Sequence, residues 1–195
     1  MKYKTSYSFE GQDLIVSTIL RKIKKGFYID IGCNHPIKIN DTFALYKKGW
    51  NGILVEPLKY YNKLYNKYRE RDQFYNCLLG VKKKYFMCVF KQTGLSSNHY
   101  PTIKRYKKRF KTIKTMTVEA KKLDDIIEDY RKKKKKKPKI NFIKIDIEGN
   151  ELDVLKSFSI EKYLPDLLQI ELKNFNLNRI DNKIHSYLYK KNYRL

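Results

Sequence analysis

The sequence predicts an α/β fold with a mostly parallel, doubly wound sheet and helices on both faces. Short apolar runs rich in β-branched and aromatic residues alternate with segments of helical periodicity. The first two of these runs, and the strongest later one, carry acids at or near their ends. No internal repeat and no second core are visible, so we expect residues 1–195 to form one domain.

The predicted elements follow from periodicity and from turn residues. A run closed by Gly80 and another that begins at Tyr85 are linked by only Val81 and three lysines, which favours a β-hairpin. Segment 94–114 is polar and tyrosine-rich and receives no assignment. Expected strands are 27–31, 50–55, 74–79, 85–90, 115–118, 141–147 and 167–172, with a further strand starting at Tyr193; expected helices are 14–25 capped by Asp13, 41–48, 58–70, 123–130, 151–158 and 184–190.

The chain is strongly basic, with 44 Lys and Arg against 20 Asp and Glu and a formal charge of +24. Such a charge indicates a polyanionic partner, either a nucleic acid or an acidic glycan. Lys, Asn, Ile and Tyr are all abundant, as in proteins from AT-rich genomes, and we expect this compositional drift to explain most of the excess. Residues 131–137 contain six consecutive lysines before Pro138 and are expected to form a solvated loop.

The cysteines and the apolar runs bear on location. Cys33, Cys77 and Cys88 are odd in number and lie in or beside apolar runs, which predicts buried free thiols in a reducing compartment. No Cys/His cluster indicates a zinc site. No apolar run reaches the length of a membrane span, and the N-terminus shows no secretion signal, so the expected location is cytoplasmic.

The first candidate site is the turn that follows strand 27–31. Asp30 lies near the carboxyl end of this strand, Gly32 follows at once, and Asn34 and Pro36 predict a turn. In open α/β sheets the ligand crevice lies outside the carboxyl ends of the strands. Gly32 would let the backbone approach a ligand there, and Asp30 would accept hydrogen bonds from it.

A second carboxylate stands at the end of the next strand. Glu56 follows Asp30 by 26 residues, an arrangement that suits bidentate acceptance from ribose hydroxyls. The alternative is a solvated strand-end acid. The turn lacks a full G-x-G-x-x-G, which argues against a pyrophosphate and favours a ligand with a ribose and no phosphates, such as S-adenosylmethionine.

A third group of charged residues lies in strand 141–147. Alternation along a strand places Lys144, Asp146 and Glu148 on one face, over the ligand crevice. Asp146 would accept from the amino group of the ligand or steer a substrate hydroxyl, and charge near a buried strand requires a partner. His35 is either a base near neutral pH or a turn histidine bound to backbone. These residues do not require a metal, although the clustered acids Asp146 and Glu148 leave metal binding as an alternative.

These motifs resemble the FkbM family of S-adenosylmethionine-dependent methyltransferases. The resemblance implies a Rossmann-like methyltransferase fold with cofactor contacts from Asp30, Gly32, Asn34 and Glu56. It also implies that Asp146, with Glu148, lies at the reaction centre. The similar blocks, in the order of the family, are 12–13 (QD), 30–36 (DIGCNHP), 41–42 (DT), 48–57 (KGWNGILVEP), 123–127 (LDDII) and 142–151 (FIKIDIEGNE).

The expected function is O-methyl transfer from S-adenosylmethionine to a hydroxyl, with Asp146 or His35 orienting or accepting the proton. A sugar or glycan acceptor is the common theme of the family. A second hypothesis is ribose 2′-O-methylation of RNA, supported by the net charge, the many tyrosines and the trio Lys144, Asp146 and Lys173. A third is an inactive methyltransferase fold that binds a polyanion through its basic surface.

Overall fold

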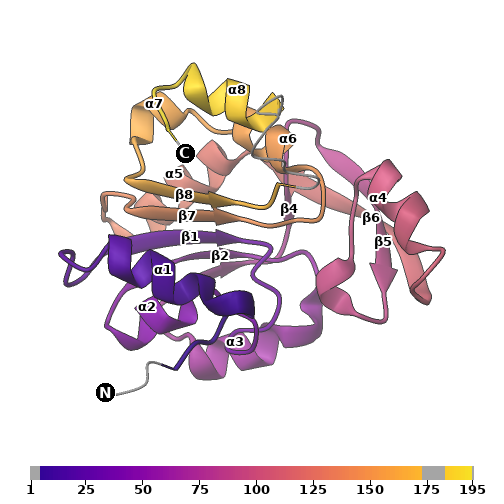
Figure 1. The fold of residues 1–195 in the computed structure, drawn as a ribbon, viewed down its shortest axis with the longest axis horizontal. Helices are drawn as coiled ribbons and strands as arrows, with labels where there is room; N and C mark the ends of the chain where they lie inside the picture. Colours follow the sequence, from indigo (N-terminus) through magenta and orange to yellow (C-terminus); the bar gives the residue numbers. More distant parts are fainter. Residues whose placement is uncertain (1–4, 173–182, 195) are drawn as a thin grey trace.

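The central element is a five-stranded, all-parallel sheet with the strand order β3-β2-β1-β7-β8 (Figure 1). The computed structural model describes residues 5–172 and 183–194. The order reverses between β1 and β7, so their carboxyl ends flank the switch point at which open α/β sheets bind ligands. This confirms the predicted parallel sheet. Its strands are β1 (Phe27–Ile31), β2 (Asn51–Val55), β3 (Gln73–Tyr75), β7 (Phe142–Ile145) and β8 (Leu167–Ile170).

Helices cover both faces of this sheet, because successive side chains of each buried strand point to opposite sides. Tyr28 of β1 packs in the cluster that includes α1, α2 and α3, whereas Ile29 and Ile31 pack against the other layer. The first layer consists of α1 (Gln12–Ile19), α2 (Phe43–Lys47) and α3 (Asn62–Tyr68), and the second of α5 (Leu123–Lys134), α6 (Glu151–Lys156), α7 (Ile160–Tyr163) and α8 (Lys183–Tyr189).

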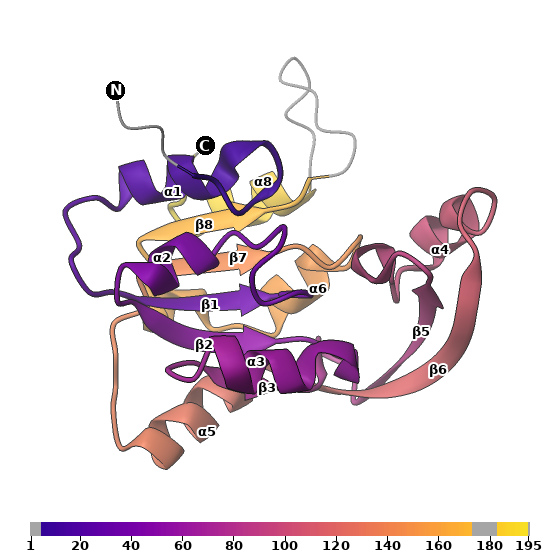
Figure 2. The same ribbon diagram turned by 90° about the horizontal axis from the view of Figure 1, so that it is seen from below.

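A second, three-stranded sheet projects beyond the carboxyl ends of the parallel strands (Figure 2). We call residues 82–122, which carry most of it, the arm. Its elements are β5 (Lys84–Phe90), α4 (Tyr100–Tyr106) and β6 (Thr112–Lys121), and β4 (Leu78–Leu79) pairs with β6 at the base of the arm.

The predicted hairpin between residues 74–79 and 85–90 is wrong. The order of the second sheet is β4-β6-β5, so β6 separates the two expected partners. β6 comes from the end of the unassigned segment and pairs antiparallel with all of β5, from Lys84 to Phe90. The expected strand 74–79 is itself divided at Asn76, whose Nδ2 donates to the backbone carbonyl of Glu56 at 2.8 Å.

Several element ends also differ from the expectation. α5 continues to Lys134, so half of the predicted lysine loop is helical; lysine is a good helix former and a cation is favourable near a helix C-terminus. β7 ends at Ile145, two residues early. No strand begins at Tyr193 within the described residues, and Leu195 lies outside them.

Asp13 does not cap α1 as predicted. Gly11 occupies the N-cap position with a φ of 75°, and Asp13 lies buried in the first turn. Its carboxylate accepts the backbone N–H of Tyr7 at 2.8 Å and the hydroxyls of Ser6 and Ser8 at 2.6 and 3.0 Å. Asp13 therefore fastens the preceding chain to the helix.

The three cysteines are free and buried, as expected. Within residues 5–172 and 183–194, none of the helices has the length and apolar character that a membrane crossing requires.

Candidate active site

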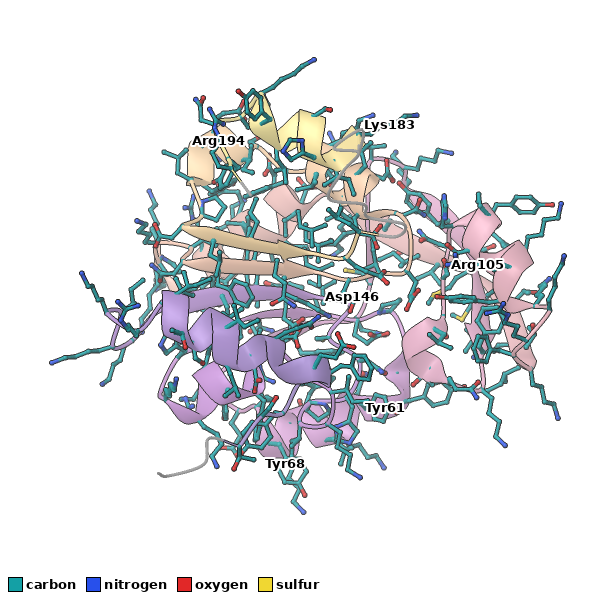
Figure 3. The ribbon with its side chains drawn as sticks, viewed as in Figure 1. Tyr61, Tyr68, Arg105, Asp146, Lys183 and Arg194 are labelled. Carbon is teal, nitrogen blue, oxygen red and sulfur yellow. The ribbon has the colours of Figure 1, made fainter. Side chains whose placement is uncertain are left out.

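A pocket opens at the switch point, between the carboxyl ends of β1, β2 and β7 and the base of the arm. It contains about 400 Å³ of space free of protein atoms, a volume that includes solvent at its mouth. Figure 3 shows Asp146 at the edge of the sheet that faces the arm. Five of the predicted site residues line this pocket, namely Gly32, Asn34, Glu56, Asp146 and Glu148.

Gly32 makes the close approach of β1 to β7 possible. Its φ is +76°, and a Cβ at this position would lie 2.0 Å from the backbone carbonyl oxygen of Asp146. The backbone N–H of Asp146 donates to the carbonyl of Ile31 at 3.2 Å. A glycine is therefore required where the two strand ends meet, and the same glycine exposes backbone to the pocket.

Asn34 links the turn to its neighbours and is itself in the left-handed region, with a φ of 42°. Its backbone N–H donates to Glu56 Oε2 at 3.0 Å, and its backbone carbonyl accepts the hydroxyl of Tyr65. Its side-chain Oδ1 accepts the Thr93 hydroxyl at 3.1 Å. The turn is thus joined both to β2 and to the arm.

Glu56 ends β2 and is 6% exposed. Oε1 accepts the N–H of Leu58 at 2.9 Å, and Oε2 accepts the N–H of Asn34. Burial raises the pKa of Glu56 to about 7, although these two backbone donors and the charge of Lys144 oppose the rise. A carboxylate has about four lone-pair sites, so Glu56 retains acceptor capacity for hydroxyl donors in the pocket.

Lys144 connects the acids of the site. Its Nζ donates to the carbonyl of Gly32 at 3.1 Å and lies 3.4 Å from Asp146 Oδ2 and 3.8 Å from Asp30 Oδ1. Burial alone would lower the pKa of Lys144, but the charges of Asp146 and Asp30 hold it above its usual value. Lys144 is therefore a buried cation that compensates both carboxylates.

Asp30 lies beneath the pocket instead of lining it, with 1% exposure. Its Oδ2 accepts the hydroxyl of Thr42 at 2.7 Å. Its Oδ1 is buried and makes no hydrogen bond to any described residue, Lys144 being the nearest cation. Asp30 thus has one acceptor atom that the protein itself leaves unsatisfied.

His35 is held by the turn that contains it. Its Nδ1 accepts the backbone N–H groups of Ile37 and Lys38 at 3.1 and 3.0 Å, and its ring packs edge-on against Tyr61. Burial, and then the charge of Lys38, lower the pKa of His35. His35 is not one of the residues that line the pocket.

Glu148 faces the arm across the pocket mouth. Because β7 ends at Ile145, the predicted alternation does not extend to Glu148, whose φ is 63°. Its Oε2 accepts the hydroxyl of Tyr106 at 2.8 Å, and its backbone carbonyl accepts the hydroxyl of Ser97 at 2.9 Å. Glu151 closes the same loop by accepting the N–H of Gly149 at 2.8 Å.

Three carboxylates at this edge also have the geometry of a possible metal site. Oxygens of Asp146, Glu148 and Glu171 all lie within 4.8 Å of one another. Oxygen ligands of this kind suit hard cations such as Mg²⁺. Acid clusters on protein surfaces are also common without an ion, so the cluster alone assigns no metal.

Two parts of the site were not anticipated. The sequence places Lys144 over the crevice but gives it a role only in the RNA hypothesis, although a lysine inside a buried strand, two residues before Asp146, is a signal for charge compensation. The arm contributes Met87, Thr93 and Ser96 to the pocket wall. The last two belong to, or adjoin, the segment whose sequence showed no clear periodicity.

The strand order, the glycine turn after β1 and the acid at the end of β2 define a Rossmann-like fold of the class that binds nucleotide-type cofactors. The methyltransferase FkbM domain matches residues 30–195. The chain therefore belongs to the FkbM methyltransferase family and is a methyltransferase, as the sequence blocks predicted. Comparison with curated proteins and with solved structures gives no significant match.

Proposed function

We propose that the protein is an S-adenosylmethionine-dependent O-methyltransferase. The observation that carries this proposal is the convergence of Gly32, Asn34, Glu56 and Asp146 on one pocket at the switch point of the sheet. When bound, S-adenosylmethionine supplies a methyl group already activated on a sulfonium. The protein then needs only to bind the cofactor, orient a hydroxyl and receive its proton.

The residues present fit such a cofactor. Glu56 offers acceptor atoms for ribose hydroxyls, and Asn34 and Gly32 form the adjoining wall. Asp30 supports the floor, and its unsatisfied Oδ1 suits an electron-poor or cationic group nearby. The turn has no second glycine for a pyrophosphate, in agreement with a ligand that carries no phosphates.

Asp146 is the best candidate for the proton step. Its side chain is 44% exposed and lies at the pocket, with Oδ2 3.4 Å from the Nζ of Lys144. A carboxylate there can accept a hydrogen bond from an incoming O–H and orient it. Glu148, held by Tyr106, borders the same space. His35 stays a prediction with less support, because its Nδ1 already accepts two backbone donors.

The first candidate for the acceptor is a hydroxyl of a sugar or glycan. Thr93, Ser96 and Asn98 give the outer wall a polar lining that suits a polyhydroxyl ligand. The second candidate is the ribose 2′-hydroxyl of RNA, favoured by the charge of the arm. Lys173, which the RNA hypothesis also invoked, lies outside the described residues.

Calorimetric titration with S-adenosylhomocysteine tests the cofactor site. We expect saturable, one-to-one binding by the wild type and about tenfold or greater weakening in Glu56→Gln, since hydrogen bonds to a charged acceptor contribute about 1.5–3 kcal/mol. A thermal melt of both proteins is the control for folding. Absence of binding heat from a well-folded wild type contradicts the proposal.

Transfer of a labelled methyl group to a panel of saccharides and RNAs tests the chemistry. We expect Asp146→Asn to lower the rate about 10²–10⁴-fold, the usual contribution of a general base, while affinity for S-adenosylhomocysteine changes less than about threefold. Lys156→Gln, an exposed change outside the pocket lining, is the matched control. If S-adenosylhomocysteine binds but no acceptor is methylated, the result contradicts the enzyme proposal and favours an inactive methyltransferase fold.

A further inference from the structure

The positive charge of the chain is concentrated in the arm. Residues 82–122 contain 13 Lys and Arg and a single acid, Glu119, whereas the other 154 residues contain 31 Lys and Arg and 19 acids. Half of the net charge thus belongs to about a fifth of the sequence. Compositional drift acts on the whole chain and does not explain this distribution.

All 13 basic side chains of the arm are exposed, and none lies within 4 Å of a carboxylate of the described residues. They extend along its full length, from Lys84 at the base to Lys91 and Lys111 at the far end, where the N–H of Lys91 donates to the carbonyl of Lys111. Arg105 lies on α4, on the projecting side of the molecule (Figure 3). The ten residues of β6 alone span about 33 Å, so the basic side chains are distributed over a length that suits a polymer. They occupy both faces of the ladder, with Lys84 on the face of Phe86 and Lys114, opposite Val89, on the other.

Exposed aromatic side chains accompany the basic residues of the arm. Phe86 is 55% exposed and Tyr100 is 74% exposed, although both are large rings. Phe86 stands opposite Thr117 in the β5–β6 ladder and shares its face with Lys84, two residues away. The neighbouring Met87 points to the other face and packs with Leu58 and Leu78, so Phe86 is not needed for that cluster.

We propose that the arm is a docking surface for single-stranded RNA. Exposed lysines neutralise phosphates, and exposed rings stack on unpaired bases. Because the arm also forms one wall of the pocket through Met87, Thr93 and Ser96, a strand bound along it runs to the pocket. This inference favours the second acceptor candidate, RNA, over a sugar or glycan. It rests on the proposed function for its chemistry, because a ribose hydroxyl of the bound strand would receive the methyl group.

Fluorescence anisotropy with a labelled single-stranded RNA of about 15 nucleotides tests the docking surface at several salt concentrations. The arm variant carries Lys84→Gln, Lys91→Gln, Lys104→Gln and Lys114→Gln. The matched control removes the same charge from the exposed lysine run that ends α5 and follows it, with Lys132→Gln, Lys134→Gln, Lys136→Gln and Lys137→Gln. We expect the arm variant to bind at least tenfold more weakly with a shallower salt dependence, and the control to change less than about threefold. Equal losses in both variants overturn the proposal.

Phe86→Ala distinguishes RNA from an acidic glycan. We expect at least fivefold weaker RNA binding with an unchanged salt slope, because stacking does not release counterions. A sulfated oligosaccharide of similar charge that binds the wild type as tightly as the RNA does, with no effect of Phe86→Ala, assigns the surface to a glycan and overturns the RNA proposal.

Binding of S-adenosylhomocysteine by the same samples keeps this inference separate from the proposed function. If the cofactor product binds and the RNA does not, only the docking surface is wrong. If the RNA binds and the cofactor product does not, the methyl-transfer proposal fails while the docking surface stands. A thermal melt of each variant tests whether it is folded. If the arm variant with four substitutions does not fold, the RNA affinity of Phe86→Ala decides whether the arm binds RNA.

Discussion

Lys144 holds the acids of the site together at the scale of single residues. Without its ammonium group, the buried Asp30 would lose the cation that lies within 4 Å of it, and Asp146 would lose the same partner. The sequence predicts Asp30, Gly32, Glu56 and Asp146 as site residues because strand ends and turns have clear local signals. It does not predict the ion pair of Lys144 with Asp30, because these two residues are more than 100 positions apart in the sequence.

Glu56 makes cofactor binding depend on pH. With its pKa raised to about 7 by burial, Glu56 loses its charge, and with it acceptor capacity, as the pH falls through about 7. We expect the affinity for S-adenosylhomocysteine to decrease on acidification, approaching about tenfold per pH unit below 7. Calorimetry between pH 6 and 8.5 measures this. An affinity that does not change over this range, or rises on acidification, contradicts it.

The Glu56 carboxyl also makes the free energy of unfolding depend on pH, in the opposite direction to its effect on cofactor affinity. Its pKa is higher in the folded state than the ordinary value of 4.5, so the folded state binds more protons between about pH 4.5 and 7. The contribution of Glu56 to the free energy of unfolding therefore declines as the pH rises through that window. Glu56→Gln is expected to flatten both pH profiles.

Gly32 is required for steric reasons that the structure identifies. We expect Gly32→Ala to destabilise the fold by more than about 3 kcal/mol, because its Cβ would collide with the Asp146 carbonyl at a positive φ. Gly49→Ala is the matched control: its φ is +90°, but a Cβ there meets nothing within 4 Å. Urea denaturation measures both. Equal losses would mean that backbone strain alone, and not the contact with β7, makes glycine necessary.

At the scale of elements, a buried arginine at the end of α3 fixes the layer that carries the turn. Arg69 is 2% exposed and its Nε pairs with Asp72 at 2.7 Å. The sequence does not predict that Arg69 is buried, because arginines in a basic chain are expected at the surface. Its other guanidinium donors reach the Pro36 carbonyl, Asn40 Oδ1, Tyr28 Oη and Thr42 Oγ1.

We expect Arg69→Met to reduce the free energy of unfolding by about 3–5 kcal/mol, because it leaves Asp72 buried without its cation. Arg71→Met, an exposed change two residues away, is expected to have an effect below about 1 kcal/mol. Chemical denaturation compares the two. Similar losses would show that Arg69 is not a structural link.

The elements that sequence predicts well are those with local signals. β1, β2 and β7 are short β-branched runs, and Gly49 marks the end of α2 with a positive φ. Strands 85–90 and 115–118 of the arm were predicted and lie within β5 and β6. Their pairing was not predicted, because β6 obtains its partners through long-range pairing, with β4 on one side and β5 on the other. Half-buried and exposed residues alternate along most of β6 and none is fully buried, so its sequence has no strong apolar pattern.

At the scale of the whole molecule, the parallel sheet supplies one side of the pocket, where we propose that the cofactor binds, and the arm supplies another wall. The five strands follow from β–α alternation, which is why the fold class and the family were predictable. The acceptor depends on the arm, and neither its shape nor the gathering of charge upon it follows from local pattern. The account therefore has two parts, a cofactor site common to the fold and an acceptor surface particular to this chain.

A crystal structure with S-adenosylhomocysteine tests the central claim most directly, which is that the ends of β1, β2 and β7 surround one ligand. The account predicts the ligand in the pocket of Gly32, Asn34 and Glu56, with its ribose hydroxyls on the Glu56 carboxylate and its sulfur on the side of Asp146. A ligand bound elsewhere, for example in the apolar pocket between β8 and α8 lined by Leu168 and Leu188, would contradict it.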